Sequence, residues 1–95
     1  MPKSRAHVYL LRCGDGTFYI GMALDVQKRL GQHTAGKGAK YTRSRGPLEL
    51  LWSEGPMTVS RALRREHQLK QLTKSQKLAL VAGKLVLKLP RRRVR

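Results

Sequence analysis

The fold of this chain is set by the stretch VYLLRCGDGTFYIG, residues 8–21. Two segments with the composition of β-strands, His7–Arg12 and Thr17–Gly21, flank the tripeptide Gly14-Asp15-Gly16. Glycine and aspartate readily adopt the backbone conformations that a tight turn between antiparallel strands requires. The stretch therefore predicts a β-hairpin with a short loop.

The expected register sorts the side chains of this hairpin onto two faces. A three-residue loop sets two cross-strand pairs, Leu10 with Ile20 and Arg12 with Phe18. The apolar face, which is the natural core face, then carries Val8, Leu10, Phe18 and Ile20. Tyr9 and Tyr19 lie together on the opposite face as diagonal neighbours. Because the chain holds only three Tyr, one Trp and one Phe, this pair calls for an explanation.

Four further elements are expected after the hairpin. Asp25 predicts the N-cap of a helix that runs to about His33, with Val26 and Leu30 on its buried stripe. The others are a strand over residues 48–54, a helix over about Thr58–Leu72, and a helix that begins at the capping box Thr73–Gln76 and ends at Gly83. This order indicates a small α+β domain.

The charge of the chain points to a polyanionic partner. Its 95 residues, enough for one domain, carry 21 Lys and Arg against five Asp and Glu, a formal net charge of +16. Nucleic acid is the first candidate, with an affinity that should fall steeply with salt; an anionic membrane surface and a ribosomal-type structural role are the alternatives. Cys13 is the only cysteine, which excludes a disulfide framework. The chain lacks an apolar signal segment and a membrane-spanning run, so we expect a cytoplasmic protein without membrane contact.

Two segments concentrate the basic residues that we expect to bind nucleic acid. The glycine-rich segment 35–47 is predicted to be a loop, and the tail 83–95 a late strand or a disordered arm. The expected binding residues are Lys37, Lys40, Tyr41, Arg43, Arg45, Arg91, Arg92 and Arg93. Gly36-Lys37-Gly38 lacks the full P-loop pattern, so no nucleotide cofactor is expected.

Candidates for chemistry lie on the two longer predicted helices. Glu66 falls between apolar residues at helical spacing, namely Ala62, Leu63 and Leu69. An inward carboxylate is costly unless it is paired or bound to a metal, so a buried salt bridge and a metal site are both open. Arg29 and His33, four positions apart, share one side of the first helix, either as a solvated basic pair or as part of a site.

These features together fit phosphodiester chemistry. Hydrolysis needs a base, a cation that stabilises charge on the phosphoryl oxygens, and an acid that holds a metal. One candidate ligand argues against a symmetric two-metal mechanism. Mg²⁺ often binds through one or two carboxylates together with waters and substrate phosphates, so Glu66 can suffice.

At these residues the chain resembles the GIY-YIG endonuclease superfamily, in particular its small stand-alone bacterial branch. His7-Val8-Tyr9 stands where that family has Gly-Ile-Tyr, and Tyr19-Ile20-Gly21 matches Tyr-Ile-Gly in residue type. Arg29 follows ten positions after the second tyrosine, and Glu66 matches the acidic metal ligand. The resemblance covers about residues 7–82, which we therefore expect to form the nuclease domain, followed by the basic tail.

The resemblance implies a three-stranded antiparallel sheet flanked by helices and an endonuclease that uses one divalent ion, Mg²⁺ or Mn²⁺. It implies that Tyr9 and Tyr19 face the scissile phosphate, one as general base or water-orienting group and the other as a positioning donor. Arg29 would stabilise charge on the phosphoryl oxygens, and His33 would assist proton transfer or bind the phosphate. Glu66 would hold the metal.

The chain departs from the family pattern at two points. His7 replaces glycine in the first motif, and many family members carry an Asn downstream of the acidic ligand, whereas this chain contains no Asn. Gln71 and Lys74 are the candidate substitutes. The leading interpretation is an endonuclease on DNA or RNA with little sequence specificity. The alternatives are a non-catalytic nucleic-acid-binding module with the same fold and a subunit that requires a partner protein.

Overall fold

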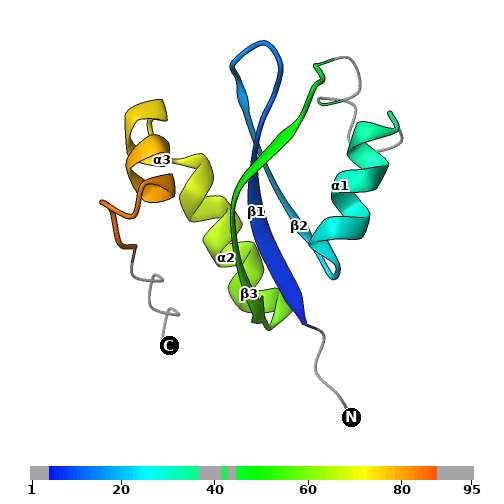
Figure 1. The fold of residues 1–95 in the computed structure, drawn as a ribbon. Coiled ribbons are helices and arrows are strands. Elements are labelled where there is room, and N and C mark those ends of the chain that lie inside the picture. Colours follow the sequence, from blue (N-terminus) through cyan, green and yellow to red (C-terminus); the bar gives the residue numbers. More distant parts are fainter. Residues whose placement is uncertain (1–4, 37–41, 43–44, 88–95) are drawn as a thin grey trace, which may run out of the picture.

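The computed structural model describes residues 5–36, 42 and 45–87. Six elements follow one another along the chain (Figure 1): β1 (Ala6–Arg12), β2 (Phe18–Ala23), α1 (Val26–Thr34), β3 (Glu49–Met57), α2 (Val59–Lys70) and α3 (Lys74–Val81). The predicted α+β class is confirmed. Within the described ranges, no helix combines the length and the apolar character needed to cross a membrane.

The hairpin has the predicted register. Leu10 pairs with Ile20 and Arg12 with Phe18. The Cys13 N–H donates to the Thr17 carbonyl at 2.8 Å, closing a loop of three residues. Gly16, the last of these, has φ +84°, a left-handed conformation that costs glycine little. Turn chemistry and side-chain alternation therefore agree, which is why the register could be predicted from the sequence.

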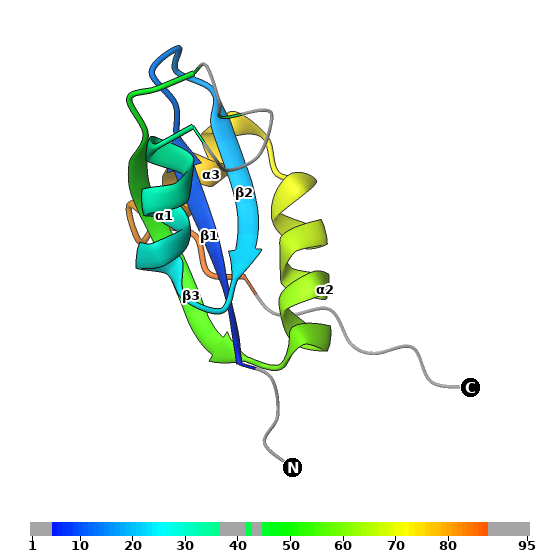
Figure 2. The ribbon, with the colours of Figure 1, turned by 90° about the vertical axis from the view of Figure 1, so that its right-hand side faces the viewer.

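The three strands form an antiparallel sheet in the order β2-β1-β3. Helices α2 and α3 lie on one side of this sheet and α1 lies on the other (Figure 1). In Figure 2 the sheet is seen from the β2 side, with α1 on one flank and α2 on the other. Groups on α1, on β2 and on α2 can therefore meet at the free edge of β2.

Both faces of the sheet are buried, whereas the sequence pattern predicted one core face. The predicted face does form the main core, which comprises Ala6, Val8, Leu10, Ile20, Ala62, Leu69 and Leu80, with Phe18 packed against it. On the opposite face, Tyr9 is 2% exposed and Leu11 is fully buried. Helix α1 covers that face, so the tyrosine pair lies beneath a helix rather than on an open surface.

The buried faces predicted for helices α1 and α2 are partly wrong. In α1, Val26 and Leu30 are only partly buried, and His33 is the buried residue. In α2, Leu63 is 50% exposed, so the predicted stripe that included it is wrong. The buried residues of α2 are Ala62, Arg65 and Leu69. The rotation of each helix about its axis follows from packing on the sheet, which the local pattern of apolar residues did not specify.

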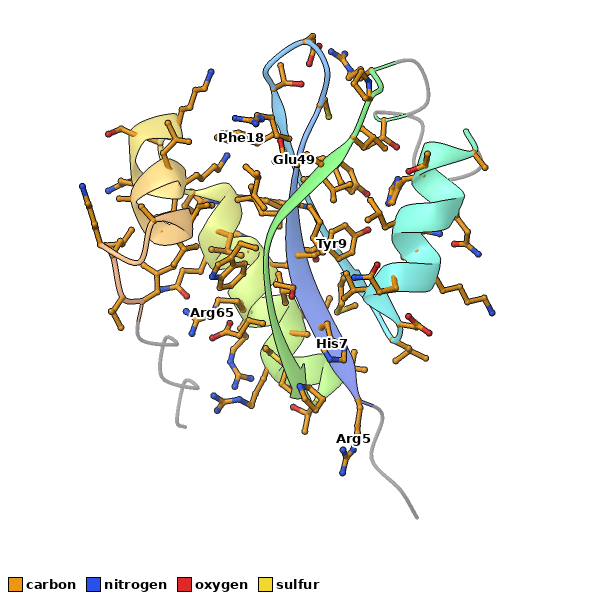
Figure 3. The ribbon with its side chains drawn as sticks, viewed as in Figure 1. Arg5, His7, Tyr9, Phe18, Glu49 and Arg65 are labelled. Carbon is orange, nitrogen blue, oxygen red and sulfur yellow. The ribbon has the colours of Figure 1, made fainter. Side chains whose placement is uncertain are left out.

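Arg65 is a buried arginine that the sequence pattern did not single out. Its Nε donates to Glu54 Oε1 on β3 at 2.8 Å, and Nη1 donates to Gln68 Oε1. Nη2 donates to the Leu87 carbonyl at 3.2 Å. Figure 3 shows Arg65 on the side of the sheet away from α1. This side chain ties α2 to β3 and to the segment that follows α3.

The predicted late strand does not form within residues 84–87. Leu85 and Leu87 instead pack against the core cluster, and the Arg65 hydrogen bond holds the Leu87 carbonyl. The remainder of the basic tail, including the predicted binding residues Arg91, Arg92 and Arg93, lies outside the described residues.

Candidate active site

A hydrogen-bonded chain connects the first tyrosine to the first helix and the following loop. The Tyr9 hydroxyl lies 2.9 Å from His33 Nε2, and His33 Nδ1 lies 2.7 Å from Thr42 Oγ1. All three side chains are at most 2% exposed. In Figure 3, Tyr9 lies between the sheet and α1. The solvated basic pair that the sequence allowed for Arg29 and His33 is therefore wrong for His33, which is buried in contact with Tyr9.

Arg29 acts on the Tyr9 hydroxyl, and it lowers the pKa of Tyr9 against the effect of burial. Both ring nitrogens of His33 have an oxygen partner, so a neutral imidazole donates one of the two hydrogen bonds and accepts the other. If the Tyr9 O–H donates to Nε2, the imidazole carries its proton on Nδ1 and donates it to Thr42 Oγ1. The Arg29 guanidinium also donates to Gln32 Oε1 at 3.0 Å, which holds it in place along α1.

Tyr19 completes an aromatic cluster around His33. Its ring centroid lies 6.3 Å from that of Tyr9 and 5.3 Å from that of the imidazole. The rings of Tyr9 and His33 meet edge to face at 6.0 Å. Such tilted contacts are favourable between aromatic rings. The diagonal placement predicted for the two tyrosines is thus confirmed, and His33 packs against both.

Gly21 leaves the space that the Tyr9 phenol occupies. Gly21 pairs with Tyr9 across the hairpin. A Cβ atom at residue 21 would lie 2.5 Å from the Tyr9 hydroxyl oxygen and 3.0 Å from a Tyr19 ring carbon. Real Cβ atoms do not approach other atoms so closely, so any other residue would displace the phenol. Steric exclusion by the Tyr9 phenol therefore explains why the third residue of the Tyr-Ile-Gly motif is a glycine.

The resemblance to GIY-YIG endonucleases implies a cleavage activity, and we expect Gly21→Ala to lower it about tenfold to a hundredfold, because the displaced phenol loses its alignment with His33. The measurement is single-turnover cleavage, together with thermal melting to confirm the fold. Gly31→Ala is the matched control, since a Cβ there meets nothing within 4 Å and alanine is favoured inside a helix. Equal activity of both variants would show that the position of the phenol is unimportant.

Burial and charge set the protonation states of this cluster. Burial raises the pKa of Tyr9, against the hydrogen bond and charge of Arg29, which lower it. Burial raises the pKa of Tyr19 as well. Burial first, and then the Arg29 charge, lower the pKa of His33 below its ordinary value of 6.5. At neutral pH both phenols are therefore protonated and the imidazole is neutral, so it can accept a proton.

Glu66 lies beside the buried face of α2 rather than within it. Its side chain is 21% exposed, and its Oε2 lies 3.6 Å from Lys70 Nζ. The negative charge of Glu66 raises the pKa of both Tyr9 and Tyr19, which places its carboxylate within electrostatic range of the pair. The buried arginine partner that the sequence allowed is not found among the described residues. The observed partner is an exposed lysine one turn away.

The residues present fit a single divalent ion held by one carboxylate. Within the described residues, no group of three His, Cys, Asp or Glu side chains lies close enough together to form a protein cage for a metal. Mg²⁺ does not need such a cage, because it retains waters and binds substrate phosphates. The Glu66 carboxylate is a hard oxygen ligand whose only described ion-pair partner is Lys70. It therefore suits this kind of site.

Arg45 is the predicted nucleic-acid-binding residue that lies within the described part of the chain. Arg45 Nη1 lies 2.6 Å from Asp15 Oδ2, and both side chains are about 40% exposed. Hydrogen bonds from Thr17 first, and then from Arg45, lower the pKa of Asp15 to about 2. Arg45 thus joins the hairpin turn to the loop before β3. Like those of the tail, the other predicted residues of this loop lie outside the described residues: Lys37, Lys40, Tyr41 and Arg43.

Thr42 is a site residue that sequence reasoning missed. It is 1% exposed and hydrogen-bonds the imidazole of His33. It falls in a segment whose basic and glycine residues favoured a solvated loop, and nothing in the local pattern distinguishes it. Only the return of this segment over α1 brings Thr42 to His33.

A tyrosine pair, a helix-borne Arg and His, and a single glutamate on a second helix thus lie around one edge of the sheet, the arrangement that the resemblance to a nuclease family implies. A family model described as the GIY-YIG catalytic domain matches residues 5–79. The chain belongs to this GIY-YIG family, which is a family of nucleases.

More specifically, the chain is similar to proteins named UPF0213. One from Halobacterium salinarum is 51% identical over 74 residues, 78% of this chain and 96% of the relative. One from Streptococcus agalactiae is 47% identical over 81 residues, 85% and 92% of the two chains. The solution NMR structure of a UPF0213 protein from Bacillus halodurans superposes with TM-score 0.55 at 41% identity, covering 84% of this chain and 85% of that one. These relatives come from an archaeon as well as from bacteria.

Proposed function

We propose that the protein is a metal-dependent endonuclease that hydrolyses phosphodiester bonds of DNA or RNA with little sequence specificity. The family supports a nuclease acting on nucleic acid, and the net charge of +16 supports binding through phosphates in any sequence. The observation that carries the proposal is the 2.9 Å hydrogen bond between the Tyr9 hydroxyl and Nε2 of buried His33, whose pKa is lowered. Any buried tyrosine hydroxyl needs a hydrogen-bond partner, but a neutral imidazole is a partner that can also take up the proton.

In the proposed reaction Tyr9 receives the proton of the attacking water as it passes its own proton to His33. This transfer suits the phenol, which is too weak an acid to act alone as a phenolate at neutral pH. In the proposed tautomer His33 Nδ1 carries the proton and donates it to Thr42 Oγ1, 2.7 Å away, which leaves Nε2 free to accept. Arg29 stabilises the negative charge that develops on the phosphoryl oxygens, and Tyr19 helps to position the phosphate.

Glu66 is the proposed ligand of the divalent ion, and its carboxylate lies on the α2 side of the β2 edge. When bound, such an ion supplies positive charge to the phosphoryl and leaving oxygens. Arg29, on α1, lies on the other side of the same edge. Arg29 would then act on the phosphate directly through its guanidinium, and Glu66 would act by holding the cation, so that both would offset the negative charge of the phosphate.

The deciding experiment incubates the protein with single-stranded, duplex and branched DNA and RNA. Each substrate is tested with Mg²⁺, with Mn²⁺ and with a chelator, while binding is followed under the chelator conditions. The proposal expects cleavage that requires metal and appears in many sequence contexts. Tight binding without cleavage on any substrate would contradict the endonuclease and support the non-catalytic binding module.

The proposed role of His33 predicts a dependence of activity on pH. Because its pKa lies below 6.5, the imidazole is neutral at pH 7 and becomes protonated as the pH falls through the lowered value. Protonated His33 cannot accept the Tyr9 proton, so the single-turnover rate constant should fall on the acid side. A rate constant that shows no fall at any acid pH at which the protein remains folded would contradict the relay.

The stability of the folded protein should also depend on the protonation of His33. The unfolded chain binds a proton to His33 more readily than the folded protein does, so the contribution of His33 to stability is lost as the pH falls below 6.5. Melting of wild type and of His33→Gln, compared between pH 7 and about pH 5, isolates this contribution from those of the carboxylates.

A further inference from the structure

An apolar groove lies next to the candidate active site and shares one residue with it. Its volume is about 450 Å³, within the range of roughly 300–1,000 Å³ typical of small-ligand sites. The end of β2 and the first turns of α1 and α2 lie at the same end of the molecule (Figure 2), and the groove is lined by residues from all three. Arg29, whose positive charge acts on Tyr9, also lines it.

The lining of this groove is divided by chemistry. Apolar side chains come from the strands, from the residue after β2 and from the start of α2, namely Ala6, Met22, Ala23, Leu24 and Val59. The α1 side presents its N-cap Asp25 together with Lys28, Arg29 and Gln32. The Asp25 carboxylate accepts from the Lys28 backbone N–H at 3.1 Å, and two cations against this one carboxylate leave the polar side with net positive charge. An apolar surface facing a positively charged one suits a ligand with one flat, weakly polar part and one anionic part. A nucleotide has this composition.

Leu24 stands out among the apolar residues of the groove. It is 67% exposed although it is a large apolar side chain. It immediately precedes Asp25, whose side chain caps α1 by accepting from the Lys28 backbone N–H. The cap holds the backbone next to Leu24 in a defined conformation, so the exposed side chain projects from a rigid support. Apolar side chains in such positions can insert between or against bases.

We propose that this groove holds an unpaired nucleotide adjacent to the scissile phosphate, with its base against Leu24 and Met22 and its phosphate toward Lys28 and Arg29. The inference rests on the proposed nuclease function, to which it adds a substrate class. A base inside a duplex has its faces covered by its neighbours, so it must be unpaired or flipped out to enter such a groove. Preferred substrates are therefore nucleic acids with a single-stranded or branched segment at the cleavage position.

The position of the groove supports a nucleotide rather than another ligand. Arg29 both lines the groove and acts electrostatically on Tyr9, so it connects the groove with the candidate active site. Lys28 makes no side-chain hydrogen bond or ion pair with any residue in the described part of the chain. Its ammonium is thus available to a phosphate. The overall charge of +16 draws a polyanion to this surface.

The test measures binding in chelator, so that no substrate is cleaved. The probes are a single-stranded oligothymidylate of about twelve nucleotides, a chain of abasic deoxyribose phosphates of the same length, and a duplex. We expect wild type to bind the oligothymidylate more tightly than the abasic chain. In Leu24→Ala this preference for bases should fall about tenfold, whereas binding of the abasic chain and of the duplex should stay the same.

Leu78→Ala is the matched control, because Leu78 is a 45% exposed leucine on α3, outside the groove. It should keep the full preference for bases. Equal affinity of wild type for the two single strands, or an equal loss in both leucine variants, would overturn the groove assignment even if the protein cleaves nucleic acid. A base preference that depends on Leu24 in a protein without cleavage would retain the groove and reject the nuclease. Melting of both variants confirms their folding.

Discussion

Replacing Tyr9 by phenylalanine is expected to lower single-turnover cleavage by about a hundredfold or more. The substitution removes the hydroxyl that hydrogen-bonds His33 and keeps the buried ring. Loss of a proton-transfer group typically costs this much in rate. Stability should fall by only about 1 kcal/mol, since the variant leaves one buried imidazole nitrogen without its partner. Cleavage is therefore measured on protein shown by melting to be folded.

A double-mutant cycle with His33→Ala distinguishes a relay from two separate contributions. If Tyr9 passes its proton to His33, removing both groups should cost little more than removing Tyr9 alone, because either loss interrupts the same transfer. If the two losses multiply, each residue acts on its own and the relay is wrong. Cleavage by Tyr9→Phe at the wild-type rate would show that the tyrosine is structural.

The second large effect is expected at Glu66. In Glu66→Gln the side chain keeps its size and loses the charge that attracts a divalent ion, so cleavage should fall by about a thousandfold. Affinity for nucleic acid in chelator should stay equal or rise slightly, because a negative charge near the phosphate has been removed. Melting without metal should change little. The carboxylate pairs only with Lys70, which is 56% exposed, and such pairs contribute about 0.5 kcal/mol or less.

Two controls separate the metal role from a structural one. Lys70→Gln removes the ion-pair partner and keeps the Glu66 carboxylate, so it should cleave at nearly the wild-type rate. Glu54→Gln removes the partner of buried Arg65 and should cost about 2 kcal/mol or more in stability, while folded protein still cleaves. Two results would contradict the metal site. One is a melting temperature of Glu66→Gln as low as that of Glu54→Gln, and the other is cleavage by Glu66→Gln at the wild-type rate.

The open edge of strand β2 is the place where the candidate site residues meet. Because β1 is the central strand, one side of β2 has no neighbouring strand among residues 5–36, 42 and 45–87, and α1 and α2 flank that side (Figure 2). Tyr19 from β2, Arg29 from α1 and Glu66 from α2 interact electrostatically there. A strand added at this edge would cover the site. The three-stranded architecture is therefore part of the proposed function.

Much of the local structure could be predicted from the sequence because it depends on near neighbours. Alternation along the hairpin predicted which residues pair and placed Tyr9 beside Tyr19. Side-chain caps are equally local: Asp25 accepts from the Lys28 N–H, and Thr73 forms a capping box with Gln76. Such contacts span two to four residues, so the pattern of residue types is enough to reveal them.

The candidate site could be predicted only as a set of residues, through resemblance to a family. The sequence by itself determined the hairpin register, the helix starts, the α+β class and the excess of positive charge. Only the tertiary structure decided that His33 is buried between two tyrosines, that Thr42 holds its other nitrogen, and that Arg65 rather than Leu63 faces the sheet. These outcomes depend on how each helix is rotated against strands distant in sequence, and that rotation is set by packing between segments that no local pattern relates.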